Sequence, residues 1–260
     1  MPTELSEQLE NRLRENEQRI KAVFADIDKE IAEQRVPNGR IYFLDVNGKK
    51  IAEADIREKF QIADGTAKII ANGDFRYEGG IKQSKENLQI FAKGSVSVTP
   101  QGKQDTFADI KATGTVSIGG NHYGKIQTNS GVYIKGRMVG PIYTNNDVKI
   151  DIDSHAEIVS GGNVKVGGYT KDKELVGGKV EGNITAGGGV VARKVAKGVT
   201  IHARDEAKIH YFNFGTINSD TKVTIEQGHN AGTVNVPPSG ISSDLLGVKS
   251  PNTGRWLQPN

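Results

Sequence analysis

Apolar and small residues recur in a fixed order between Ile69 and Ile225, and this repeat organises the chain. Each copy has an Ile, a small residue two positions later, and mostly apolar residues six and eight positions after the Ile. The nine copies begin at Ile69, Ile90, Ile110, Ile126, Ile142, Ile158, Ile184, Ile201 and Ile217. The small positions are Ala71, Ala92, Ala112, Thr128, Thr144, Ser160, Ala186, Ala203 and Ser219.

The spacing within a copy predicts two short strands joined by a corner. Residues two apart on a strand share one face, so positions 0 and 2, and then 6 and 8, point to the same side. The copies start 16 to 26 residues apart, which fits one coil of a β-helix rather than a helix-containing repeat. The sequence therefore predicts a mainly β fold, a single-stranded β-helix (β-solenoid) of about nine coils over residues 66–236.

The corners carry residues that tolerate unusual backbone conformations. Glycine occurs there at Gly73, Gly94, Gly114, Gly162 and Gly188, with Ser130, Asn146 and Asp205 in equivalent places. We expect bends with positive φ at these positions. The column of small residues is expected to mark a tight corner that a large side chain would not fit.

Residues 3 to 35 are predicted to form one amphipathic helix, within an N-terminal segment of residues 1–36. Its stripe repeats every eleven residues, which is typical of a nearly straight coiled coil, and a polar Asn on such a seam can fix the oligomer state. We expect the stripe to mediate oligomerisation through Leu5, Leu9, Leu13, Asn16, Ile20, Phe24, Ile27 and Ile31. The other interpretation is a helix that packs on its own rod.

The flanking segments are predicted to cap the solenoid. Residues 41–51 have the pattern of a β-hairpin around Asn47-Gly48, and residues 52–60 could add a short helix, so residues 37–65 form the expected N-terminal cap. Longer excursions at 79–88, 99–109 and 167–183 are expected to be surface loops. The tail, residues 237–260, is expected to dock on the last coil or on another subunit through Leu245, Leu246, Trp256 and Leu257.

Composition narrows the class of protein without naming a partner. The 32 glycines and 6% aromatic residues suit thin stacked coils, and the absence of cysteine excludes disulfide and thiol chemistry. No stretch is long and apolar enough for a membrane span, and the first residues do not resemble a secretory signal. A net charge of +3 is nearly balanced, so we expect no nucleic acid partner.

Candidate catalytic or metal sites are weak, so we expect no enzyme, cofactor or metal. The densest acidic group is Asp147, Asp151 and Asp153, followed by His155, without a second acidic layer. The histidines, which do not follow a metal-binding spacing, are His122, His155, His202, His210 and His229. The outward position seven after each Ile forms a mildly basic stripe that includes Arg76, Lys149, Lys165 and Lys208. Ordinary solvation explains these groups as well as a partner would.

Residues 132–150 and 176–186 resemble the coil signature of bactofilins, the polymer-forming bacterial cytoskeletal β-helix proteins. The pattern over residues 65–230 is also similar to the β-helix of FapA-like assembly proteins, which combine such a rod with a coiled coil. The resemblance implies a non-enzymatic, self-assembling scaffold, cytoplasmic in a bacterium, that forms a trimer or polymer and binds other assembly components. A virion-associated phage tail or fibre protein remains the alternative, and a carbohydrate-binding or carbohydrate-cleaving β-helix is the second.

Overall fold

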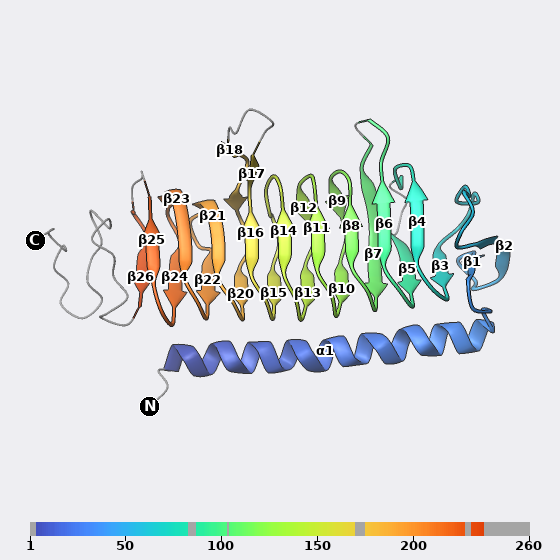
Figure 1. The fold of residues 1–260 in the computed structure, drawn as a ribbon, viewed down its shortest axis with the longest axis horizontal. Helices are drawn as coiled ribbons and strands as arrows, with labels where there is room; N and C mark the ends of the chain where they lie inside the picture. Colours follow the sequence, from blue (N-terminus) through green and yellow to red (C-terminus); the bar gives the residue numbers. More distant parts are fainter. Residues whose placement is uncertain (1–3, 83–86, 103, 170–174, 227–229, 237–260) are drawn as a thin grey trace, which may run out of the picture. The chain divides into compact units, whose positions relative to one another are not determined.

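A computed structural model describes residues 4–82, 87–102, 104–169, 175–226 and 230–236. The protein is mainly β, with one helix, α1 (Glu4–Gln34, 31 residues), and a β-solenoid of about nine coils, as predicted (Figure 1). No described helix is long and apolar enough to cross a membrane. The chain divides into two compact units, which are taken separately: residues 17–146, the N-terminal coil unit, and residues 1–16 with 147–260, the C-terminal coil unit.

The N-terminal coil unit has two parallel ladders of short strands. The first ladder runs β3 (Lys68–Ala71), β5 (Leu88–Ala92), β7 (Thr106–Ala112), β10 (Ile126–Thr128) and β13 (Ile142–Thr144). The second runs β4 (Phe75–Glu78), β6 (Val96–Thr99), β8 (Val116–Ile118) and β11 (Val132–Ile134). Ile69 is level with Ile90, Ile90 with Ile110, Ile110 with Ile126, and Ile126 with Ile142, so the predicted Ile column is a physical stack.

The C-terminal coil unit repeats this plan. Its first ladder comprises β15 (Ile158–Ser160), β20 (Ile184–Ala186), β22 (Thr200–Ala203), β24 (Thr216–Ser219) and β26 (Thr233–Asn235). Its second comprises β14 (Val148–Ile150), β16 (Val164–Val166), β21 (Val190–Val195), β23 (Ala207–Asn213) and β25 (Val223–Ile225). The stack runs from Ile158 through Ile184, Ile201 and Ile217 to Val234, so a further coil follows the last predicted copy.

Each coil has a third side that the four-column template did not include. It contains β9 (His122–Tyr123) and β12 (Met138–Val139) in one unit and β19 (Lys179–Val180) in the other. The inward residues of this side are all buried: Ile81, Thr106, His122, Met138, Ser154, Val180, Val195 and Asn213. They stack coil on coil within each unit. The excursion at residues 167–183 carries the antiparallel pair β17 (Gly168–Tyr169) and β18 (Leu175–Val176).

The column of small residues is closely packed, as expected. All nine members are buried, with Ser219 the most exposed at 5%. Where the column carries a hydroxyl, that group reaches the corner of the preceding coil: Thr128 Oγ1 donates to the carbonyl oxygen of Gly114 at 2.5 Å, and Ser219 Oγ to that of Asp205 at 2.6 Å. These residues therefore combine small volume with a hydrogen bond between coils.

The corners are glycine-rich for a reason other than the expected one. Of the five predicted corner glycines, only Gly73 has a positive φ. Ser130, Asn146 and Asp205 have negative φ, and the one non-glycine residue with positive φ in the described ranges is Arg35, which follows α1. A Cβ on Gly94 would lie 2.7 Å from the backbone carbon of Gly73 in the neighbouring coil. Close approach of successive backbones, rather than a left-handed bend, therefore excludes side chains there.

The predicted hairpin forms and lies on the first coil. β1 (Arg40–Leu44) pairs antiparallel with β2 (Lys50–Asp55) and with β3. The short helix expected at residues 52–60 is wrong: β2 continues to Asp55 and a turn follows, because pairing with β1 prevails over local helix preference. Phe60 then packs against Phe43, Phe75 and Tyr77, with ring centroids 5.6 to 6.0 Å away.

Candidate functional site

In each unit, α1 packs on the outward face of the first ladder. The outward residues lie one position after each Ile: Ile70, Phe91, Lys111, Gln127, Tyr143, Val159, Thr185, His202 and Asn218. In the N-terminal coil unit, Val23 and Ile27 of the helix pack on Phe91, while Val36 and Leu44 pack with Ile70. Arg19 lies over the ring of Tyr143 at 3.8 Å from its centroid.

Ion pairs also hold the helix within each unit. In the N-terminal coil unit, acidic residues of α1 meet lysines of successive coils: Glu30 with Lys68 at 2.8 Å, Asp28 with Lys93 at 2.7 Å, and Asp26 with Lys111 at 2.6 Å. In the C-terminal coil unit, Arg12 pairs with Glu157 at 2.8 Å and Glu10 with Arg204 at 2.5 Å. Charge complementarity thus accompanies apolar packing, although each exposed pair contributes little by itself.

The predicted oligomerisation stripe is covered within one chain. Leu9, Leu13, Asn16, Ile20 and Ile27 are buried, and Leu5, Phe24 and Ile31 are half-buried. This matches the interpretation in which the helix packs on its own coils, and a helix–helix seam would require these residues to leave that surface. The coils offer outward apolar residues that can receive the helix, since Ile70, Phe91 and Val159 are outward and buried.

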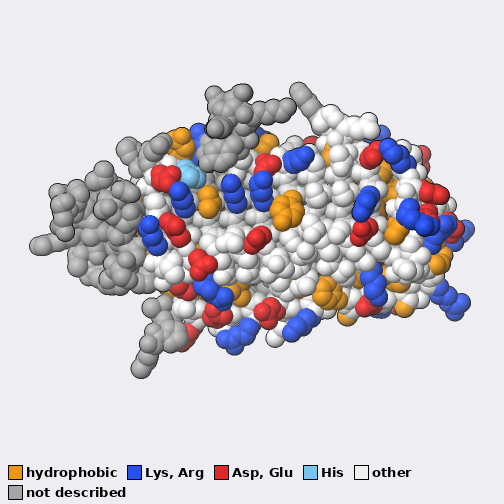
Figure 2. Space-filling model, in the orientation of Figure 1, with side chains coloured by type: hydrophobic (Ala, Val, Ile, Leu, Met, Phe, Trp, Pro, Cys, Tyr) orange, Lys and Arg blue, Asp and Glu red, His pale blue; other side chains and the backbone are white. Residues whose placement is uncertain are grey.

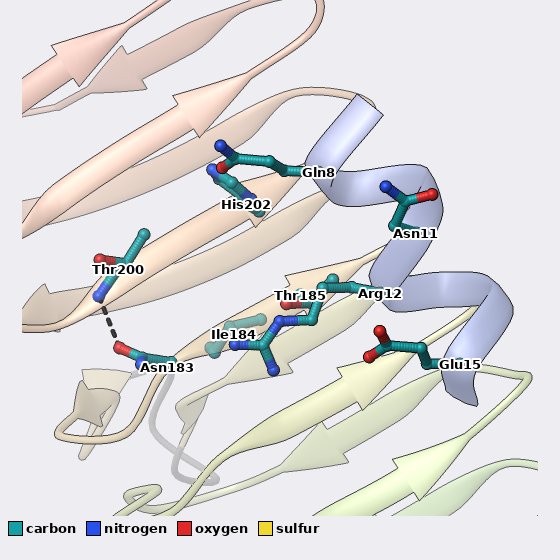
Figure 3. Close-up of a pocket in the computed structure, with 9 residues that line it drawn as sticks. All are labelled: Gln8, Asn11, Arg12, Glu15, Asn183, Ile184, Thr185, Thr200 and His202. Atoms are coloured by element: carbon teal, nitrogen blue, oxygen red, sulfur yellow. Dashed lines mark hydrogen bonds between the residues drawn. The ribbon is translucent and has the colours of Figure 1, made fainter. Parts of the chain in front are cut away.

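A polar groove lies in the C-terminal coil unit (Figure 3). It has a volume of about 450 Å³ and lies between the first turns of α1 and strands β20 and β22. Gln8, Asn11, Arg12 and Glu15 come from α1, and the sheet contributes Asn183, Ile184, Thr185, Thr200 and His202. Asn11 and Glu15 are exposed, whereas Thr185 is 7% exposed. Sequence reasoning missed this groove because it assigned no role to the position one after each Ile.

His202 is the titratable group of the groove with a buried ring nitrogen and a shifted pKa. Its Nε2 is buried without a hydrogen-bond partner among the described residues. Burial lowers the pKa of His202 below its ordinary value, and nearby Arg12 lowers it further, while the carboxylate of Asp220 acts in the opposite direction. The imidazole is therefore neutral at pH 7, with one nitrogen available to donate or accept a hydrogen bond.

The predicted acidic group is used to hold coils together. Asp147 Oδ1 accepts a hydrogen bond from the backbone N–H of Asn163 at 2.7 Å, and Asp153 Oδ1 accepts one from the N–H of Lys179 at 2.9 Å. Asp151 lies 3.5 Å from Lys149. Asp147 and Asp153 therefore each link one coil to the next through a backbone hydrogen bond.

The histidines are dispersed. His155 pairs with Glu181, and His210 with Glu226 at 2.7 Å. His122 is fully buried on the third side, where burial lowers its pKa to about 4 and neither ring nitrogen makes a well-formed hydrogen bond within the described part of the chain. His229 and the tail residues Leu245, Leu246, Trp256 and Leu257 lie outside the described residues. Within the described ranges, no three His, Asp or Glu side chains are placed to hold a metal ion.

The basic stripe predicted on the second ladder is accompanied by acids. Lys208 pairs with Glu226 at 2.5 Å, and the carboxylate of Glu226 has a lowered pKa because Lys208 and His210 donate hydrogen bonds to it. Cationic and anionic side chains are interspersed on the face that Figure 2 shows. This surface is consistent with ordinary solvation.

No protein-family model, curated protein or solved structure matches this chain. The structure establishes a β-solenoid fold, and the function must be inferred from the residues of the chain itself.

Proposed function

We propose that the protein is a non-enzymatic structural scaffold, a self-assembling β-solenoid of the kind that the bactofilin-like pattern implies. The observation that carries this proposal is the use of polar corner side chains as links between coils. Asn163 Oδ1 accepts from the backbone N–H of Gly189 at 2.8 Å, and Asn183 Oδ1 from that of Thr200 at 2.8 Å. Carboxylates and amides that would serve a catalytic site hold the stack in register instead.

The same links recur in the N-terminal coil unit. Asp74 Oδ1 accepts from the N–H of Ser95 at 2.9 Å, Asp109 Oδ1 from Lys125 at 2.8 Å, and Asn121 Oδ1 from Arg137 at 2.9 Å. A side chain that satisfies a backbone donor of the next coil at these corners stiffens the solenoid without adding a thick core. Stiffness of this kind suits a mechanical or spacing role.

Strand edges support self-assembly as part of this role. Among the described residues, the two ladders of the C-terminal coil unit end at β25 and β26. A parallel edge strand presents backbone donors and acceptors to a further strand. In the N-terminal coil unit the first strand of one ladder, β3, is covered by the antiparallel hairpin β1–β2, and β4 of the other ladder is an edge strand among the described residues. We therefore place the self-association contact at the β25–β26 edge and not at the hairpin.

Light scattering and negative-stain microscopy of the full-length protein test the proposal. A scaffold is expected to give discrete oligomers or filaments whose mass rises with protein concentration. A particle that stays monomeric across the accessible concentration range would refute self-assembly.

Crosslinking α1 to its own coils tests whether the protein self-associates through the β25–β26 edge or through the apolar stripe of the helix. The chain has no cysteine, so Arg12→Cys with Glu157→Cys, and Asp26→Cys with Lys111→Cys, give two specific pairs. Each pair replaces an observed ion pair, and a short bismaleimide joins the thiols. We expect assembly to persist after both crosslinks form. Assembly that disappears on crosslinking would show that α1 must leave its sheet to associate.

A further inference from the structure

We propose that the groove between α1 and strands β20 and β22 is a binding site for a small, neutral, hydroxyl-rich ligand of the size of one or two sugar rings. This inference does not rest on the scaffold role, because it concerns a different surface of the C-terminal coil unit. A groove of about 450 Å³ lies within the size range of small-molecule sites. The side chains around it decide which chemistry it accepts.

Several polar side chains line the groove without hydrogen-bonding to other described residues. Gln8 and Glu15 extend from α1 toward the strands, and Asn11 borders the groove between them along the helix (Figure 3). Their side chains, and that of Thr185 on the sheet, make no hydrogen bond with another described residue. Nε2 of His202 is buried and also unpartnered within the described ranges. A ligand that supplied a partner to the buried Nε2 of His202 would remove the penalty of leaving that atom unsatisfied, and it would replace water at the exposed groups.

At the corners of the same coils, by contrast, polar side chains are engaged in hydrogen bonds between coils. Asn163 and Asn183 each use their side-chain oxygen on a backbone N–H of the next coil. Asn183 and Thr200 also line the groove. The groove therefore offers amide donors and acceptors, hydroxyls, an imidazole and a carboxylate within one space, the mixture that hydroxyl groups can satisfy in both directions.

The charges around the groove argue against anionic small ligands. The cation of the groove, Arg12, is already paired with Glu157 at 2.8 Å. Glu15 adds a negative charge, and His202 is neutral because burial lowers its pKa. The balance therefore disfavours phosphate, sulfate and carboxylate ligands. A neutral polyol meets no such repulsion.

A second hollow, in the N-terminal coil unit, provides an internal comparison. It has a volume of about 230 Å³ and is lined by Gln89, Phe91, Asp109, Ile110, Lys111, Lys125 and Gln127. Its charged groups are engaged: Asp109 accepts from the N–H of Lys125, and Lys111 pairs with Asp26. It serves as the control site because it has about half the volume of the groove, its Asp109 and Lys111 are engaged, and no imidazole lines it.

Titration of the full-length protein with glucose and maltose, followed by two-dimensional amide NMR, tests the assignment. We expect shifts confined to residues 8–15, 183–186 and 200–203, with inorganic phosphate at the same concentration producing none there. Sugar titrations that leave these amides unmoved, or a stronger response to phosphate, would overturn the proposal. Neither result would affect the scaffold proposal, which is measured by particle mass.

Variants then connect binding to the named groups. Asn11→Ala removes an exposed amide, and Thr185→Val removes a hydroxyl while keeping a β-branched side chain on its strand. Each is expected to weaken maltose binding roughly tenfold, the effect of one or two lost hydrogen bonds. Gln127→Ala, in the second hollow, should leave the affinity unchanged. An affinity that is equal in all three proteins, with circular dichroism unaltered, would contradict the site.

Discussion

The carboxylate of Asp147 accepts a hydrogen bond of 2.7 Å from the backbone N–H of Asn163, which lies sixteen residues later in the chain. Asn163 repeats the arrangement with Gly189 at 2.8 Å. A parallel strand ladder by itself leaves donors unpaired where the chain turns, and these side chains supply the acceptors. The Asn and Asp residues of this solenoid therefore stabilise its corners, and their removal should be felt in stability.

The first prediction compares two neighbouring aspartates. Asp147→Ala removes an inter-coil hydrogen bond and should lower the free energy of unfolding by about 1 kcal/mol. Asp151→Ala, whose carboxylate lies 3.5 Å from Lys149, should change it by less than about 0.5 kcal/mol. Urea unfolding monitored by circular dichroism measures both. Equal effects would mean that the corner hydrogen bond contributes nothing specific.

The second prediction concerns the small column. Ala112 and Ala186 are fully buried, so Ala112→Leu or Ala186→Leu should cost roughly 1–3 kcal/mol or more through overpacking. Lys149→Ala, at an outward position, is the control and should be nearly neutral. Thermal unfolding checks this comparison. Near-wild-type melting of both leucine variants would show that the coils leave room at these corners.

The third prediction compares outward aromatic residues on the two ladders. Phe91 is 7% exposed beneath α1, whereas Tyr133 is 46% exposed. Phe91→Ala should destabilise the protein by about 3 kcal/mol, because it loses contact with Val23 and Ile27. Tyr133→Ala should cost less than about 1 kcal/mol. If the two variants unfolded at the same denaturant concentration, the helix would not be packed on this ladder in solution.

The fourth prediction is a pH dependence that arises from His122. Its folded pKa of about 4 lies below the ordinary value of about 6.5, so the unfolded chain binds the proton more readily. The stability contributed by the neutral ring is complete above pH ~6.5 and falls as the pH drops toward ~4, by on the order of 3 kcal/mol in total.

His122→Met should flatten this part of the stability profile, because Met138 already occupies the equivalent place in the next coil. His155→Asn, at an exposed site, serves as the control. Chemical unfolding at a series of pH values measures the profile. A wild-type curve that is level between pH ~6.5 and ~4 would place His122 in contact with water or with an acidic partner.

The sequence by itself determined the solenoid. Ile126 and Ile142 stack in register, and Ala112 and Ala186 are buried, because the period of a strand fixes which residues share a face. The hairpin was equally readable, since Asn47-Gly48 is a local turn signal. These features depend on neighbours in the chain, or on identical positions of successive copies.

Tertiary structure alone decided what covers the coils. The stripe of α1 is apolar whether it meets another helix or a sheet, and the sequence therefore left both partners open. The outward Phe91 is buried because Val23 and Ile27 of the helix pack on it. The groove exists because Asn11 and Thr185, which lie far apart in the chain, both line it. The side-chain pairing of Asp147 with the next coil is likewise a long-range contact. Local patterning specifies each face of an element, but which faces meet depends on the free energy of packing the whole chain.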